Sequence, residues 1–273
     1  MPGGRLFRHL SWVQGTSLAA LLDRADSTAL PALGGMARPN GVVIASERFF
    51  AFAGRDGSLL EGEMPEVPRF ARRIPLLRGI ARLGMSVSPL LQRGGVAGRL
   101  ERLMLFAVLL APIAFVFLPG RAALVAGTVM TVGLIAWLMR GRTLYLHGAE
   151  HRAIAAAEMG LLGRTWEGRA RPSRFSLRCG TNFVALVLPI TLLADRLWPF
   201  APALWTPVVL AVLSLGLTME LWRVVQGSSM PMARVFLYPG LALQRLTTRE
   251  PTIDETRLAL TAVASVLRRE LET

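Results

Sequence analysis

Residues 103–139, "LMLFAVLLAPIAFVFLPGRAALVAGTVMTVGLIAWLM", decide the class of fold that the sequence predicts. They hold two uncharged apolar runs, 103–118 and 122–139, separated by the short turn "PGR". A helix that crosses a bilayer needs about 20 apolar residues, with a lower limit of about 17, and each run reaches that limit with a residue or two of flank. Because the turn is so short, the two runs must lie antiparallel. We therefore expect a transmembrane hairpin.

A second pair of apolar runs, 182–198 and 203–222, predicts a second hairpin. Its charged residues, Asp195, Arg196 and Glu220, lie near the ends of the runs, so no charge of the kind that serves transport is expected in the middle of the membrane. The sequence thus predicts a mainly α membrane protein with four transmembrane helices, arranged as two hairpins.

The distribution of arginine predicts the orientation of this transmembrane region, residues 103–222. Arginines are frequent before the first run and in the loop 140–181, but sparse in the turns within each hairpin. The positive-inside rule therefore puts both termini and this loop in the cytoplasm. Residues 223–273 are then a cytoplasmic tail that ends in an amphipathic helix from Thr252 onward.

The composition agrees with a membrane protein. The chain has 273 residues, of which 52% are hydrophobic, and a formal net charge of +13 without a single lysine. A sequence pI near 11.6 often indicates nucleic-acid binding. We expect none here, because arginines that flank apolar runs set membrane orientation. The single cysteine, Cys179, excludes an internal disulfide framework.

The N-terminal third divides into three parts. Residues 1–33 are expected to be a flexible segment with one short helical pattern. Residues 34–68 combine β-forming side chains with the turn sequence "GRDG" at 54–57, which predicts a small β-hairpin unit. Residues 69–102 mix arginines with leucines, which predicts interfacial helices that contact anionic membrane lipids.

The stretch "LHGAEHRAIAAAE", residues 146–158, predicts a metal site. On a helix, His147, Glu150, His151 and Glu158 fall within an arc of about 100°. The order H-x-x-E-H is that of enzymes in which two histidines bind zinc and the glutamate is a general base. Such a catalytic site keeps one position open for water. The alternative is a pair of histidines on a polar helix face near lipid headgroups.

Cys179 is the second candidate centre. It lies in "RCGTN", residues 178–182, between Arg178 and the predicted start of the third apolar helix. A neighbouring arginine and a helix N-terminus both favour the thiolate, which is the form that binds metals and attacks substrates. The alternative is a small residue at a membrane boundary.

Four motifs carry a resemblance to a known family: "IPLLRGI" (74–80), "HGAEHRAIAAAE" (147–158), "RCGT" (178–181) and "PGLALQRLTTREP" (239–251). Together they resemble the YqhQ-like family of bacterial membrane proteins, a domain of unknown function whose members are predicted metal-dependent enzymes. The resemblance runs from about Gly34 to the C-terminus.

The resemblance also implies site residues, and this chain departs from three of them. It implies roles for His147, Glu150, His151, Glu158, Arg178, Cys179, Gln244, Thr247, Thr248 and Glu250. Ser176 stands where the family usually has histidine, and Met36 and Asn40 stand where it has glutamine and glutamate. If the family's metal needs that third histidine, this chain binds metal weakly, uses Cys179 or Glu158 instead, or has lost the activity.

The first functional hypothesis is a metal-dependent hydrolase at the cytoplasmic face of the bacterial inner membrane. His147 and His151 would hold a divalent metal, with zinc the ion that best suits imidazole together with thiolate. Cys179 or Glu158 would complete the shell, and Glu150 would be the general base. The substrate would be a lipid headgroup or a segment of a membrane protein.

The alternative is a non-enzymatic membrane protein, such as a scaffold, an assembly factor or a transporter accessory with a membrane-protein partner. The same polar cluster would then connect the loop to the tail, and the three departures favour this hypothesis. A third hypothesis, a cysteine hydrolase that uses Cys179 with His151, requires the two segments to touch.

Overall fold

The chain divides into two compact units. The computed structural model describes residues 15–92, 95–115, 117–201, 203, 205–227 and 235–272. The unit that we call the sheet unit combines Met1–Glu66, Leu138–Cys179 and Gln244–Thr273. The unit that we call the helical unit combines Val67–Trp137 and Gly180–Leu243. The sheet unit is therefore assembled from three separate stretches of sequence.

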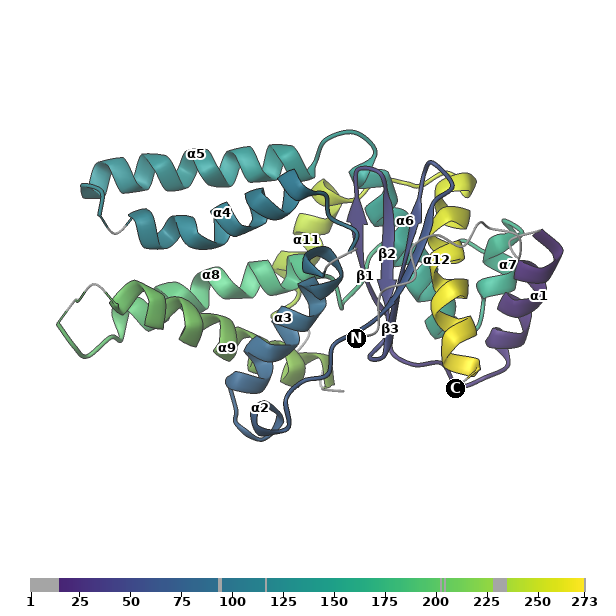
Figure 1. Cartoon of the computed structure of the whole chain (residues 1–273), viewed down its shortest axis with the longest axis horizontal. Coiled ribbons are helices and arrows are strands. Elements are labelled where there is room, and N and C mark those ends of the chain that lie inside the picture. Colours follow the sequence, from purple (N-terminus) through teal and green to yellow (C-terminus); the bar gives the residue numbers. More distant parts are fainter. Residues whose placement is uncertain are drawn as a thin grey trace. The chain divides into compact units, whose positions relative to one another are not determined.

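A four-stranded antiparallel sheet forms the centre of the sheet unit (Figure 1). Its strands follow one another in space as they do in the chain: β1 (Gly34–Arg38), β2 (Gly41–Ala45), β3 (Phe49–Gly54) and β4 (Leu59–Glu63). Side chains alternate between the two faces of a strand, so Val42 and Ile44 share one face. Their cross-strand partners are Ala53 and Ala51, so a large side chain faces a small one at each position.

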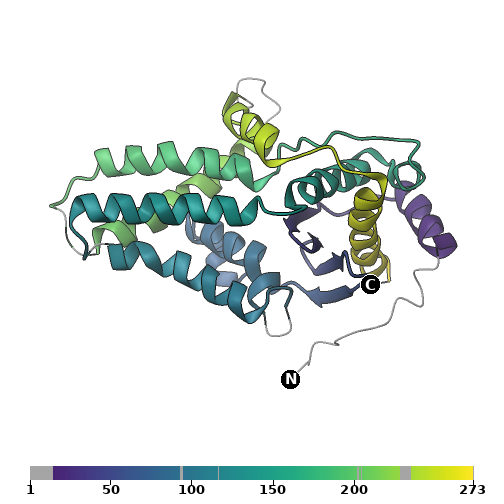
Figure 2. The ribbon, with the colours of Figure 1, turned by 90° about the horizontal axis from the view of Figure 1, so that it is seen from above.

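Two long helices pack on this sheet and supply most of the core. They are α6 (Thr143–Met159) and α12 (Ile253–Leu271), which lie side by side against the strands (Figures 1 and 2). A capping box starts α12, because the Thr252 side chain accepts from the backbone of Glu255 and the Glu255 side chain accepts from the backbone of Thr252. Leu146 of α6 and Leu260, Val263 and Leu267 of α12 are fully buried in this core.

Two further helices complete the sheet unit: α1 (Gly15–Asp26) and α7 (Leu162–Trp166). The Asp26 carboxylate accepts hydrogen bonds from the backbone N–H groups of Leu162 and Gly163, at 2.7 and 3.0 Å. Leu18 and Leu22 of α1 are fully buried in the core. The segment that the sequence predicts to be flexible therefore includes a packed helix, and its residues 1–14 lie outside the described residues.

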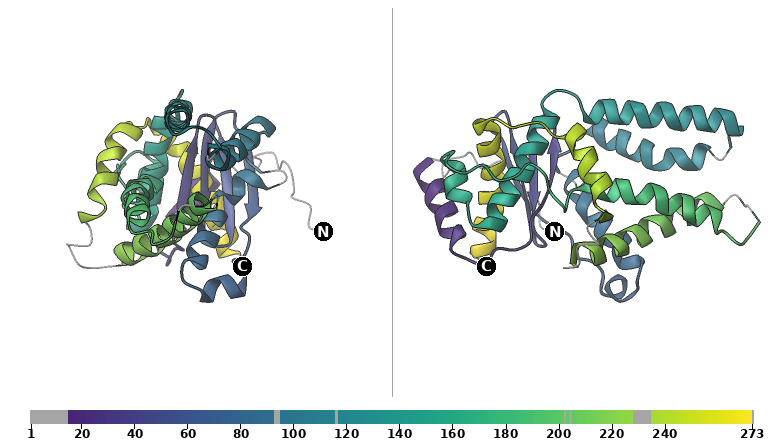
Figure 3. Two further views of the ribbon diagram at one scale, coloured as in Figure 1. Left: turned by 90° about the vertical axis from the view of Figure 1, so that its left-hand side faces the viewer. Right: turned by 180° about the vertical axis from the view of Figure 1, so that it is seen from behind.

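The helical unit contains longer apolar helices, which Figure 3 shows from two further sides. The described helices are α2 (Arg69–Arg73), α3 (Leu77–Leu91), α4 (Arg99–Phe115), α5 (Gly120–Leu138), α8 (Gly180–Arg196), α9 (Thr206–Gly227) and most of α11 (Tyr238–Thr247). Helix α8 packs along α9, and α3 also contacts α9.

The prediction of four transmembrane helices is wrong. Among the described residues one helix, Thr206–Gln226 within α9, is long and apolar enough to cross a membrane. Helices α4 and α8 are 17 residues long and include charged ends. At 1.5 Å per residue such a helix spans about 25 Å, less than the hydrocarbon core of about 30 Å. Hydropathy identified the apolar runs, but two of the helices that they form, α4 and α8, are too short.

The rest of the predicted fold class also needs correction. The predicted β-hairpin unit is a four-stranded sheet, because residues 34–38 and 59–63 form strands as well. The predicted cytoplasmic loop and tail are not peripheral, since α6 and α12 are the two helices that cover the sheet. Their sequences mix charged residues with short apolar side chains, and only the pairing with the sheet reveals which face is buried.

Candidate metal centre

Helix α6 carries both histidines, and a glycine between them lets the chain after α11 approach closely. The backbone N–H of Arg249 donates to the carbonyl oxygen of Leu144 at 2.9 Å. A Cβ atom at Gly148 would overlap the carbonyl oxygen of Arg249. Residues 247–251 can therefore lie directly along the helix, where their backbone reaches His147.

Both imidazoles are oriented by backbone carbonyl groups. Nδ1 of His147 lies 2.9 Å from the carbonyl oxygen of Thr247, and Nδ1 of His151 lies 2.7 Å from that of Arg174. A carbonyl oxygen can only accept, so each Nδ1 carries the proton and each Nε2 keeps its lone pair. Histidine ligands of metals are usually fixed in this way, by a hydrogen bond from the nitrogen that does not bind the metal.

Cys179 lies beside the two unprotonated imidazole nitrogens. Its Sγ is 3.2 Å from Nε2 of His147, to which the thiol donates. The ring centroids of His147 and His151 are 4.4 Å apart, at an interplanar angle of 63°. One ligand atom from each of the three residues lies within 4.8 Å of the others. This group of two imidazoles and a thiol could hold a metal ion.

One nitrogen in this group has no partner. Nε2 of His151 is buried and accepts no hydrogen bond within the part of the chain that the structure describes. A buried polar atom without a partner costs about 1–3 kcal/mol, so such atoms are rare unless a ligand or water satisfies them. The lone pair of His151 is therefore available for a ligand.

Burial keeps both histidines neutral, which is the form that binds metals. Desolvation lowers the pKa of His147, against a hydrogen bond to Thr247 that raises it. Desolvation, with a smaller contribution from His147, lowers the pKa of His151 to about 3. Neutral imidazoles do not have to lose a proton when they bind an ion, so only the thiol of Cys179 would release one.

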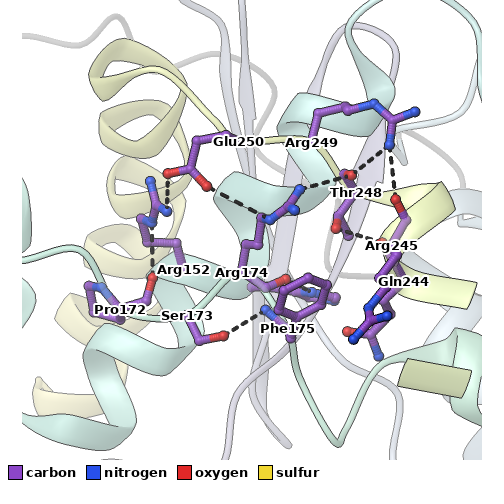
Figure 4. A network of polar contacts seen from close by, with 11 residues as sticks. Arg152, Pro172, Ser173, Arg174, Phe175, Gln244, Arg245, Thr248, Arg249 and Glu250 are labelled. Carbon is purple, nitrogen blue, oxygen red and sulfur yellow. Dashed lines mark hydrogen bonds and ion pairs between the residues drawn. The ribbon is translucent and has the colours of Figure 1, made fainter. Parts of the chain in front are cut away.

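A network of arginines holds the segment that supplies one of the two carbonyl groups (Figure 4). Arg174 donates to the carbonyl oxygen of Thr248 at 3.1 Å, and its Nε lies 3.8 Å from the carboxylate of Glu250. The buried Arg152 donates to the carbonyl oxygen of Pro172 at 3.0 Å and to Glu250 at 2.6 Å. These bonds tie residues 172–174 to residues 248–250, so the Arg174 carbonyl stays in place.

Gln244 fixes the next part of the same segment. Its side chain is fully buried, accepts from the backbone N–H of Ser176 at 2.9 Å and donates to the carbonyl oxygen of Ser176 at 2.7 Å. The Ser176 hydroxyl accepts from the backbone N–H of Arg178 at 3.1 Å. Ser176, where the resemblance implies a histidine, thus has a local structural contact, and Gln244 positions the chain that leads to Cys179.

The predicted general base, Glu150, lies outside the group of three. A Cβ atom at Gly35 would come within 2.7 Å of Cγ of Glu150, so its side chain packs against β1. Burial raises the pKa of Glu150 to about 8, while a hydrogen bond from the Ala37 backbone lowers it. Near neutral pH the uncharged acid is therefore favoured.

The other predicted residues are more distant from the group. Glu158 is exposed and forms an ion pair with Arg178 at 2.7 Å. Met36 is in β1, paired with Val43. Asn40 is in the turn before β2, where its carbonyl oxygen accepts from the backbone N–H of Arg55 at 2.8 Å.

The sequence did not reveal the carbonyl groups of Thr247 and Arg174, because a backbone acceptor can belong to any residue type. One available signal was Gly148, an unusual residue in the middle of a helix. The structure also shows that the Cys179 segment and the histidine helix touch, with His147 rather than His151 in direct contact with the sulfur atom.

These features define a class: a mainly helical protein with a small antiparallel sheet and a buried His-His-Cys group. The chain belongs to the family described as "Protein of unknown function (DUF1385)", whose model matches residues 120–269. This confirms the resemblance. The "Uncharacterized protein YqhQ" of Bacillus subtilis (strain 168) is 32% identical over 134 residues, which are 47% of this chain and 42% of that protein. The match thus spans less than half the length of this relative. No solved structure is significantly similar to the chain.

Proposed function

We propose that this protein is a zinc-dependent hydrolase whose metal is held by His147, His151 and Cys179. The observation that carries the proposal is the buried, unpartnered Nε2 of His151 beside Nε2 of His147 and Sγ of Cys179. Two imidazoles and one thiolate provide three protein ligands, the number found in catalytic zinc sites, which keep the fourth position open. Zinc would supply Lewis acidity and lower the pKa of a water molecule.

The residues of the chain contribute orientation and proton control. The carbonyl groups of Thr247 and Arg174 hold each imidazole in the tautomer that leaves Nε2 free. Cys179 would give up its proton, since the thiolate is the metal-binding form. Glu150 has the raised pKa that suits an acid or base near neutral pH. To act on substrate, its carboxyl group would have to turn from β1 towards the histidines.

The charge pattern around α9 supports a location at the cytoplasmic face of a bacterial inner membrane. Arg223 lies near the C-terminal end of the candidate span, and Arg245 and Arg249 follow it, while the nine residues before the span contain no arginine. The positive-inside rule then assigns the C-terminal end of α9 to the cytoplasm. Helix α12 follows α9 in the chain and is part of the core of the sheet unit.

A second candidate is a non-enzymatic scaffold in which the same residues connect three chain segments. The observation in its favour is that Glu150 packs on β1 rather than on the histidines. In this case the contacts of His147 with Thr247 and Cys179 would be structural, and no metal would bind.

Four preparations purified without chelator separate the two candidates: the parent, His147→Ala, His151→Ala and Glu150→Gln. The hydrolase proposal predicts stoichiometric zinc in the parent and in Glu150→Gln, and its loss from both histidine variants. If Glu150 is the general base, its variant should hydrolyse esters or phosphoesters about 10²–10⁴-fold more slowly than the parent. The scaffold candidate predicts no zinc in the parent and a lower melting temperature in all three variants. A parent without zinc would end the hydrolase proposal.

A further inference from the structure

Helices α2 and α3 of the helical unit meet at a sharp bend at Leu76. The backbone φ of Leu76 is +68°, a left-handed conformation that is uncommon for a side chain of this size. Leu76 packs against α9, since a Cβ atom at Gly216 would lie 3.0 Å from Cβ of Leu76. We call residues 69–82 the elbow. Contact with α9 stabilises its strained turn.

The elbow is also fixed to the candidate span by contacts beyond its middle. Arg78 donates to Glu220 through Nε at 2.6 Å and through Nη2 at 2.5 Å. A Cβ atom at Gly79 would lie 2.8 Å from Cβ of Met219. These contacts fall in the C-terminal half of the span Thr206–Gln226. An ion pair is costly in the centre of a bilayer, so this end of α9 belongs at the depth of the lipid headgroups.

The outer surface of the elbow mixes large apolar side chains with arginines. Phe70, Ile74 and Leu77 are 65%, 50% and 39% exposed. Arg69 and Arg73 are also exposed and directly precede Phe70 and Ile74 in sequence. Apolar side chains between basic residues are typical of segments that lie in the membrane interface, where the arginines contact phosphate groups and the apolar side chains enter the acyl region.

We propose that the elbow binds the anionic phospholipid headgroups of the leaflet in which α9 ends. Charge selects the partner, because the exposed charges of α2 are all positive. Continuity with α9 selects a bilayer rather than a protein surface, since Arg78 and Glu220 hold the elbow at headgroup depth. This inference is independent of the metal centre and goes beyond the proposed hydrolase function.

A spin-label experiment on the full chain tests the proposal. Phe70→Cys is made in a Cys179→Ser background and labelled with a nitroxide, and the protein is placed in nanodiscs of phosphatidylcholine with or without phosphatidylglycerol. Asp56→Cys, on the exposed turn before β4, is the matched aqueous control. Collisions with oxygen and with a water-soluble nickel complex are measured by electron paramagnetic resonance.

With phosphatidylglycerol, the label at position 70 should collide mainly with oxygen, and the control should collide mainly with nickel. The double substitution Arg69→Gln and Arg73→Gln should lower the ratio of oxygen to nickel collisions at position 70 several-fold. Removal of phosphatidylglycerol should have the same effect. Equal nickel accessibility at positions 70 and 56 in both lipid mixtures would overturn the proposal. So would protection from both reagents, which indicates a protein partner, and so would oxygen accessibility that is insensitive to lipid charge and to the arginines.

Discussion

The sheet unit and the helical unit use the same apolar residue types in opposite ways. Leu146 and Leu260, in α6 and α12, are fully buried between helix and sheet. Val129 and Leu188, in α5 and α8, are 66% and 64% exposed. The sheet unit forms its own hydrophobic core, whereas the helical unit leaves large side chains uncovered. The apolar character of a sequence run therefore does not predict whether its side chains will be buried against other parts of the protein or exposed on the surface of a unit.

The largest expected effect is the loss of a core side chain in the sheet unit. Leu260→Ala should reduce the free energy of unfolding by about 2–5 kcal/mol, because it creates a cavity between α12 and the sheet. The matched change Leu188→Ala, on an exposed position of α8, should alter it by less than about 0.5 kcal/mol. Denaturant titration of the detergent-solubilised protein measures both. Equal effects would remove the distinction between the units.

The buried carboxyl group of Glu150 should make the sheet unit sensitive to pH. Its pKa rises from 4.5 to about 8 on folding, so the folded state binds more protons between these values. Stability should thus be greatest below pH 4.5 for this group and fall as the pH rises to about 8, by up to about 1.4 kcal/mol per pKa unit. Glu150→Gln should abolish this slope. The measurement is the free energy of unfolding against pH with chelator present, and an unchanged slope in the variant would contradict the assignment.

The close approach at Gly148 should tolerate no added methyl group. Gly148→Ala should destabilise the protein by about 1–3 kcal/mol, because its Cβ atom would overlap the Arg249 carbonyl. Gly84 is the control in the helical unit, since nothing lies within 4 Å of a Cβ atom there. Gly84→Ala should be neutral or stabilise α3 by up to about 1 kcal/mol. If Gly148→Ala and Gly84→Ala lowered the melting temperature equally, the close contact of Gly148 with Arg249 would not explain the effect.

The smallest expected effect is at Glu158. Its ion pair with Arg178 is exposed on both sides, and such pairs contribute at most about 1 kcal/mol. Glu158→Gln should change the melting temperature little and leave the zinc content unchanged, because the side chain lies outside the group of three. Loss of zinc in this variant would restore Glu158 as a ligand.

Some of this site could be predicted from the sequence. The spacing of His147 and His151 places both imidazoles on one face of a helix, as the structure shows. The same spacing could not reveal that Glu150 faces β1. A helix face about 100° wide can contact two different elements, here β1 and the segment that carries Cys179. The contact with Cys179 depends on residues 244–250, whose buried Gln244 and backbone carbonyls fix the chain far from α6 in sequence.

Less of the fold could be predicted, because it too depends on contacts between segments that are far apart in the sequence. Hydropathy measures each run in isolation, and α4, α8 and α9 look alike by this measure, although α9 alone of these three is long enough to cross a membrane. Strands β1 and β4 are short and contain glycine or glutamate. Their pairing with β2 and β3, rather than intrinsic preference, makes them strands.

X-ray absorption at the zinc edge of the purified full chain tests the central claim most directly. The metal centre predicts one sulfur ligand at about 2.3 Å and nitrogen ligands at about 2.0–2.1 Å, with the sulfur ligand lost in Cys179→Ser and the nitrogen signal reduced in His151→Ala. A stoichiometric zinc ion without sulfur, or no zinc in the parent protein, would contradict the assignment of His147, His151 and Cys179 as its ligands.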